Sequence, residues 1–220
     1  MTKCLLNNEE LDLMIEIFEK KYPETETELV HSSPFELLIA TILSAQCTDV
    51  RVNIVTEKMF KELNTPEDFA ALTPEELSPY IKTCGLYKTK SKNIVNACKL
   101  LISEFNGIVP QTHKELMSLP GVGRKTANVV LSNAFNIPAI AVDTHVFRVT
   151  NRIGIVNADD VLKTEKQLMD RLPSEIWSDA HHWFIYHGRR VCKARNPLCE
   201  NCELNEICCY YKKNRTGDEL

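Results

Sequence analysis

Lys125 is a candidate catalytic residue, because it follows a glycine-rich turn. The segment reads Leu-Pro-Gly-Val-Gly-Arg-Lys over residues 119–125, and Asp143 follows 18 residues later. Gly121 and Gly123 have no β-carbon, so the backbone can turn tightly and bring its amides against a phosphate. Unpaired amides and the helix dipole both favour an anion at a helix N-terminus. The pattern therefore predicts a phosphate site beside this lysine, with a solvated surface lysine as the alternative.

The chemistry open to these two side chains is amine catalysis assisted by a carboxylate. An uncharged primary amine can attack carbon and remain bound to it as an imine, which a hydroxyl cannot do. A helix N-terminus, neighbouring cations and desolvation would each favour the uncharged form of Lys125. Asp143 could accept a proton, but aspartate is also well suited to cap the helix expected to begin near Thr144. The two roles are compatible, because a cap holds a carboxylate rigidly.

A second candidate site is a cysteine array near the end of the chain. Cys192, Cys199, Cys202 and Cys208 are spaced C-x6-C-x2-C-x5-C. Structural zinc sites usually show two close cysteine pairs, whereas only Cys199 and Cys202 form one here. Thiolates bind zinc and iron–sulfur clusters alike, so the spacing leaves both metals open. Cys209 is a further thiol that could replace Cys208 as a ligand.

The remaining cysteines, Cys4, Cys47, Cys84 and Cys98, are scattered among apolar or helical positions. The N-terminus lacks a signal-peptide pattern, and no stretch of ~18 apolar residues could cross a membrane. We therefore expect a cytoplasmic protein with no membrane partner. In such a protein, cysteines favour metal binding or catalysis over disulfides.

The elements that position these residues are expected to be helices, which makes the fold all-α. Seven glycines in 220 residues are few, and no run alternates apolar and polar residues as a strand would. Capping-box patterns at 33–36, 73–76 and 112–115 predict helix starts. Asn106-Gly107 is typical of a helix end. The expected helices are 9–21, 34–46, 49–62, 66–71, 74–80, 88–105, 113–118, 124–135, 145–153, 160–171 and 179–191.

The net charge of −4 hides an uneven distribution of charged residues. Residues 1–30 carry eight acidic against three basic side chains, a balance of −5. Residues 82–125 carry eight lysines and arginines, including Lys90, against two glutamates, a balance of +6. Arg189, Arg190, Lys193 and Arg195 form a second basic group. A molecule polarised in this way can bind a polyanion through its basic face.

Three motifs in this order resemble one protein family. Residues 119–127 (LPGVGRKTA) resemble the helix-hairpin-helix of the DNA-repair glycosylase superfamily, and residues 142–148 (VDTHVFR) resemble its aspartate segment. The cysteine array resembles the iron–sulfur loop of the endonuclease III branch. Matches at residues 44–46 and 85–87 extend the resemblance over essentially the whole chain. It implies a six-helix barrel domain with the helix-hairpin-helix at 27–137 and a discontinuous iron–sulfur cluster domain from 1–26 and 138–220.

The resemblance also implies an activity in base excision repair. A bifunctional DNA N-glycosylase and AP lyase would remove oxidised pyrimidines from duplex DNA and cleave the abasic site by β-elimination through a lysine Schiff base. Lys125 and Asp143 would be catalytic, and the four cysteines of the array would hold one [4Fe–4S] cluster per chain. The protein would be a monomer associated with the nucleoid, and its partner would be duplex DNA with damaged pyrimidines or abasic sites. The implied DNA-binding or intercalating residues are Gln46, Leu86, Gly121, Gly123, Arg124, Arg190, Lys193 and Arg195.

Several of these assignments have alternatives, either a purely structural role for the residue or another class of protein. Leu86 could be a loop leucine that packs into the core, and Gln46 a polar helix end. His181, His182 and His187 read as one helix face rather than as a metal site. An iron–sulfur adenine mismatch glycosylase is disfavoured, because the stretch 38–43 has no acidic residue and the hairpin lysine is present. A non-enzymatic DNA-binding or redox-sensing module would not need Lys125, Asp143 and Gln46 together.

Overall fold

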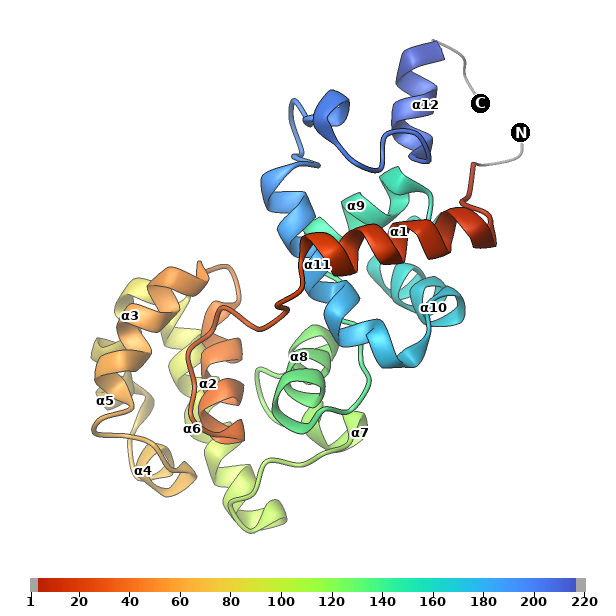
Figure 1. The fold of residues 1–220 in the computed structure, drawn as a ribbon. Coiled ribbons are helices and arrows are strands. Elements are labelled where there is room, and N and C mark those ends of the chain that lie inside the picture. Colours follow the sequence, from red (N-terminus) through yellow and green to blue (C-terminus); the bar gives the residue numbers. More distant parts are fainter. Residues whose placement is uncertain (1–3, 217–220) are drawn as a thin grey trace. The chain divides into compact units, whose positions relative to one another are not determined.

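The computed structural model describes residues 4–216 and divides into two compact units (Figure 1). The central unit is Thr27–Ile137, and the terminal unit combines the chain up to Glu26 with the chain from Pro138 onward. The part of the chain that is described contains helices and no strand, which confirms the all-α expectation. None of its helices is long and apolar enough to span a membrane.

The central unit is built around α2 (Pro34–Ser44), whose residues from Phe35 to Leu43 are all buried. A helix that is apolar on all sides belongs inside a core. Helices α3 and α8 pack against α2, and α4 and α5 pack against α6. The other helices of this unit are α3 (Asp49–Met59), α4 (Pro66–Ala70), α5 (Pro74–Ile81), η1 (Lys82–Cys84), α6 (Tyr87–Phe105), α7 (His113–Leu116) and α8 (Arg124–Phe135).

The terminal unit joins α1 to the C-terminal helices through one apolar core. Met14 and Phe18 of α1 are fully buried against residues such as Val149 and Phe184. The rings of Phe18 and Phe184 pack edge to face, with 5.8 Å between their centroids. The helices of this unit are α1 (Asn8–Lys21), α9 (Thr144–Ile153), α10 (Val161–Arg171), η2 (Ser174–Ile176), α11 (Trp177–Arg190), η3 (Cys199–Asn201) and α12 (Cys209–Thr216).

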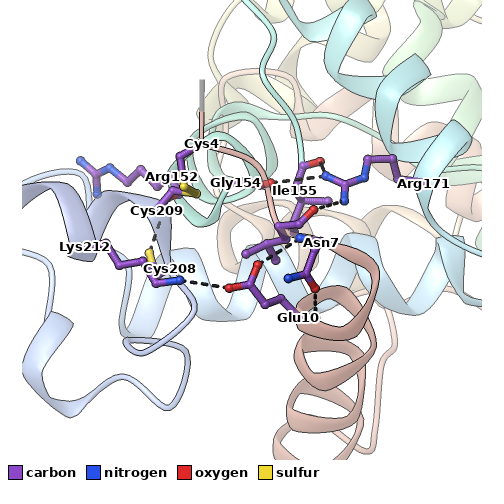
Figure 2. The surroundings of a disulfide bond; sticks show 11 residues. Cys4, Asn7, Glu10, Arg152, Gly154, Ile155, Arg171, Cys208, Cys209 and Lys212 are labelled. Carbon is purple, nitrogen blue, oxygen red and sulfur yellow. Dashed lines mark hydrogen bonds and ion pairs between the residues drawn. A yellow bond between two sulfur atoms is a disulfide. The ribbon is translucent and has the colours of Figure 1, made fainter. Parts of the chain in front are cut away.

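Cys209 is disulfide-bonded to Cys4, which corrects the expectation of a spare thiol and of a chain without disulfides (Figure 2). The two cysteines are 205 positions apart in the sequence, so only the fold brings them together. Gly154, at φ +97°, makes room for the bridge, because a β-carbon there would clash with the sulfur of Cys209. Nearby, the ammonium of Lys212 binds Glu10 at 3.0 Å. The bridge therefore joins the N-terminal segment to the start of α12.

Ser33, Thr73 and Thr112 all cap their helices as expected, but of these three starts one forms a full capping box. Thr73 and Glu76 form a full capping box at the start of α5. At α2, Ser33 accepts a hydrogen bond from the Glu36 amide, as predicted. The Glu36 carboxylate, however, accepts from the amide and hydroxyl of Ser32, at 2.6 and 2.7 Å, rather than from the Ser33 amide. At α7 the Glu115 carboxylate accepts from the Thr112 hydroxyl instead of the Thr112 amide. Helix α12 was not expected, because its sequence is polar and has no apolar stripe.

Candidate functional site

The glycine turn connects α7 to α8 as the sequence predicts. Gly121 has φ +84°, and a β-carbon there would lie 3.0 Å from that of Asn93, so both conformation and space require glycine. Gly123 is extended and caps α8, and nothing lies within 4 Å of the place of its missing β-carbon. Gly123 has no side chain to bind the first amides of α8. The turn therefore offers an open helix N-terminus of the kind that binds anions.

Lys125 is the second residue of α8, and its side chain is exposed. Arg124 and Gly121 beside it are also exposed, which gives this end of the helix a positive surface. Asn128, one turn further along, is buried, and its side chain binds that of His113. The desolvation expected for Lys125 is thus not supplied by burial within the folded chain.

Asp143 caps α9 in the terminal unit. Its Oδ1 accepts hydrogen bonds from the amides of His145 and Val146, both at 2.8 Å. The expected helix cap is thereby confirmed. Burial lowers the pKa of His145, the carboxylate of Asp143 opposes this effect, and Arg148 adds to it. Two amide donors and a helix N-terminus hold this carboxylate in one orientation.

Gln46 and Leu86 lie on two exposed turns of the central unit. The expected helix 34–46 ends at Ser44, and Gln46 follows in the left-handed region at φ 55°. Leu86 is also left-handed, at φ 46°, and its side chain is 57% exposed. The alternative that Leu86 packs into the core is therefore wrong. Backbone conformations of this kind, unfavourable for a residue other than glycine, cluster at functional sites.

The four cysteines of the array line a single cavity together with His187. Burial raises the pKa of Cys208 to about 11, and it also raises the pKa of Cys199 and Cys202. His187 is buried, its Nε2 lies 3.6 Å from the sulfur of Cys202, and burial lowers its pKa to about 4. The cavity therefore brings together four cysteine sulfurs, which bind a metal when the thiols lose their protons.

The arrangement of these thiols fits a cluster better than a single ion. No three His, Cys, Asp or Glu side chains of residues 4–216 converge as ligands of one metal ion. In a [4Fe–4S] cluster each cysteine binds a different iron, so the four sulfurs surround a volume and need not meet at a point. Four thiols around one cavity match that requirement.

Two arginines of α9, which sequence reasoning did not single out, hold the loop of the array. Arg148 donates from Nε to the carbonyl of Cys192 at 3.1 Å. Arg152 donates to the carbonyls of Lys193 and Ala194, at 2.7 and 3.1 Å, and lies 3.7 Å from the sulfur of Cys192. The side chains of Lys193 and of the nearby Arg195 are exposed. Only the spacing of the two arginines, one helical turn apart, could have indicated this role.

The structure places two residues of the expected basic groups, Arg190 and Lys90, in different surroundings. The guanidinium of Arg190 is exposed and lies over the rings of Tyr186 and Tyr22, 5.0 and 5.9 Å from their centroids. Lys90 does not belong to the basic surface at all, because it is only 4% exposed. Its position in a run of lysines gives no sign of this burial. The burial results from the packing of α6 against its neighbouring helices.

Comparison with known proteins places the chain in a family. Residues 39–174 match the HhH-GPD superfamily of base excision DNA repair proteins, and residues 192–208 match the iron–sulfur binding domain of endonuclease III. Endonuclease III of Bacillus subtilis (strain 168) is 50% identical over 205 residues, 93% of this chain and 94% of the relative. That of Escherichia coli (strain K12) is 50% identical over 191 residues, 87% and 90% of the two chains.

A solved structure agrees with these sequence matches. A trapped covalent intermediate of endonuclease III with DNA has a TM-score of 0.90 and 50% identity, covering 96% of this chain and all of that one. The chain therefore belongs to the endonuclease III family of base excision repair DNA glycosylases and AP lyases. It carries a [4Fe–4S] cluster. Both the family match at 192–208 and the cavity lined by four thiols support this cofactor.

Proposed function

We propose that this enzyme removes oxidised pyrimidines from duplex DNA and then cleaves the strand, with Lys125 as the nucleophile. The observation that carries the proposal is an exposed lysine in the first turn of α8, directly after an open glycine turn. A phosphate bound at that turn would set the sugar of a neighbouring nucleotide near the amine. Bound DNA would also exclude water from Lys125, which favours its uncharged form.

The reaction assigns a step to each catalytic side chain. The Nζ of Lys125 bonds to C1′ of the sugar while the glycosidic bond breaks, and the base leaves with that electron pair. Asp143 accepts the proton that the amine loses and stabilises positive charge on the sugar. The C1′–O4′ bond then breaks as O4′ takes up a proton, and the lysine nitrogen and C1′ form the iminium. A base removes a C2′ proton, a C2′–C3′ double bond forms, and the C3′–O bond breaks to release the 3′ phosphate. The strand is thereby cut by β-elimination.

Gln46 and Leu86 are proposed to fill the space that an extruded base leaves. A glycosylase must take its target base out of the stack, which costs unpairing and unstacking energy. Leu86 would insert as an apolar wedge, and the amide of Gln46 would pair with the orphaned base. The exposure of both residues on tight turns supports these roles.

The proposed cluster ligands are Cys192, Cys199, Cys202 and Cys208. The cluster would act as a scaffold, because the loop between the first two ligands carries Lys193 and Arg195 toward solvent. With Arg190, these residues would bind DNA phosphates, and Gly121, Gly123 and Arg124 would do so at the hairpin. The terminal unit would then be the cluster domain and the central unit the barrel domain with the hairpin. An enzyme with these partners would work in the cytoplasm at the nucleoid.

The adenine mismatch alternative finds no support in α2. That branch needs a catalytic glutamate in the helix before the inserting glutamine, and Glu36 is the one acidic residue of α2. Glu36 is buried, and its carboxylate is bonded to Ser32. It is therefore committed to the start of its own helix.

The proposed substrate class is tested with duplexes that each carry one defined lesion. We expect cleavage at thymine glycol and at hydroxylated cytosine, and little at adenine opposite an oxidised guanine. Each duplex is run with and without borohydride, which reduces the imine to a stable covalent complex. Removal of mismatched adenine without covalent trapping would contradict the proposal.

A further inference from the structure

Lys90 makes a buried connection between the two turns that carry Gln46 and Leu86. Its ammonium donates to the carbonyls of Leu43 and Cys84, both at 2.8 Å. Only 4% of Lys90 is exposed, so this contact lies inside the central unit. A charged group is rarely buried without such partners, since burial removes its hydration.

The two carbonyls stand just before the exposed turns. Leu43 belongs to the last turn of α2, where carbonyls have no partner within the helix, and Gln46 follows three residues later. Cys84 ends η1, and Leu86 follows two residues later. Lys90 itself lies in the first turn of α6, which begins directly after Leu86. One ammonium thus joins the ends of three helices.

The turns need such support, because both are unfavourable for their residues. Gln46 and Leu86 have φ values of 55° and 46°, and Gly85 between Cys84 and Leu86 has φ 67°. Residues other than glycine persist in this region only where the surrounding structure holds them. Hydrogen bonds from a charged donor are among the strongest available for that purpose.

We propose that Lys90 is a positioning residue that holds Gln46 and Leu86 at a fixed separation, so that both can enter the duplex when the base leaves. The inference rests on the proposed insertion roles of these two residues. Without the ammonium, two buried carbonyls would lose their donor and the turns could move independently. Misplacement of about 1 Å can cost on the order of a hundredfold in rate.

The test compares base excision with cleavage at an abasic site. Lys90→Met removes the ammonium and keeps most of the side-chain volume. We expect its single-turnover excision of a paired oxidised pyrimidine to fall about 10- to 100-fold. Cleavage at a preformed abasic site should fall much less, since no paired base has to be extruded there. Lys58→Met, which removes an exposed lysine of α3, should leave both rates unchanged.

A double-mutant cycle shows whether Lys90 acts through the wedge. If it does, Lys90→Met added to Leu86→Ala should slow excision less than it slows the wild type. Equal slowing in both backgrounds, or equal slowing on both substrates, would overturn the inference. If Leu86→Ala itself excises at the wild-type rate, the insertion role fails first. Should Lys90→Met not fold, Lys90→Gln, which keeps one donor, is judged by the same ratio of rates.

Discussion

Asp143 caps α9, and in the proposed reaction the same side chain is the proton acceptor. Its Oδ1 accepts two backbone amides at the start of α9, as a capping side chain does. The same bonds restrict the carboxylate to one orientation, which a general base or a charge-stabilising group requires. The stability and activity of variants can separate the two functions, because the cap needs an oxygen acceptor and the reaction needs a charge.

Asp143→Asn and Asp143→Ala should therefore differ in stability and agree in activity. Asparagine keeps the capping oxygen, so the free energy of unfolding should stay near that of the wild type, whereas alanine should cost about 1 kcal/mol. Both variants lose the charge, and turnover should fall by roughly two to four orders of magnitude. Urea unfolding and single-turnover excision measure the two effects. A fully active Asp143→Ala would show that the residue is only a cap.

Among the elements, the N-terminal segment is held to the rest of its unit by a disulfide and by hydrogen bonds. The disulfide joins Cys4 to Cys209, and Arg171 donates to the carbonyls of Leu6 and Ile155 (Figure 2). The amide of Leu6 also donates to the carbonyl of Gly154 at 2.9 Å. The hydrogen bonds remain when the disulfide is reduced, so the fold should survive its loss with lower stability.

Cys4→Ser should lower the free energy of unfolding by about 2–4 kcal/mol, since the bridge closes a very long loop. Its excision rate should equal that of the wild type. Urea unfolding with and without a thiol reductant provides the measurement. The reductant should destabilise the wild type and leave Cys4→Ser unchanged, and equal sensitivity of both proteins would argue against the bridge.

The cysteine loop should depend on iron for its structure. Cys199→Ser removes a proposed ligand of the cluster. The unfolded chain has no preformed metal site, so metal binding and folding of the loop are coupled. We expect purified Cys199→Ser to contain much less than the four irons of the wild-type cluster and to be poorly soluble. Cys47→Ser, in the central unit, should keep its iron. A full complement of iron in Cys199→Ser would mean that another side chain binds the cluster.

Local signals predicted most helices, and they failed where distant contacts decide. The start and end of α8 agree with the expected 124–135, because a glycine turn precedes it and Asn136 ends it in the left-handed region. The disulfide could not be predicted, since no local pattern relates Cys4 to Cys209. The expectation that Lys90 belongs to the basic surface is wrong because here too contacts distant in the sequence decide. Its burial depends on how α2 and η1 meet α6, which the run of lysines does not encode.

At the scale of the whole molecule, an overall negative charge coexists with basic groups at specific places. The hairpin of the central unit exposes Arg124 and Lys125, and the loop of the terminal unit exposes Lys193 and Arg195. Phosphate contacts through such residues release counterions from the DNA. The logarithm of the binding constant should therefore fall linearly with the logarithm of the salt concentration. Each contact accounts for a slope of about −0.9.

Arg195→Ala should weaken binding to damaged and undamaged duplex alike and reduce the salt slope by about one. Leu86→Ala should leave the slope unchanged, because a wedge carries no charge, and should slow excision. Fluorescence anisotropy over a series of salt concentrations measures both variants. An Arg195→Ala slope equal to that of the wild type would place the phosphate contacts on other residues.

The most direct test of the central claim is borohydride trapping on a duplex with one oxidised pyrimidine. The wild type should form a covalent complex with DNA, because the amine of Lys125 becomes an imine with the sugar. Lys125→Gln should form none and should not cleave the strand, while its affinity for the duplex stays nearly the same. Trapping by Lys125→Gln at the wild-type rate would show that another amine is the nucleophile and would contradict this account.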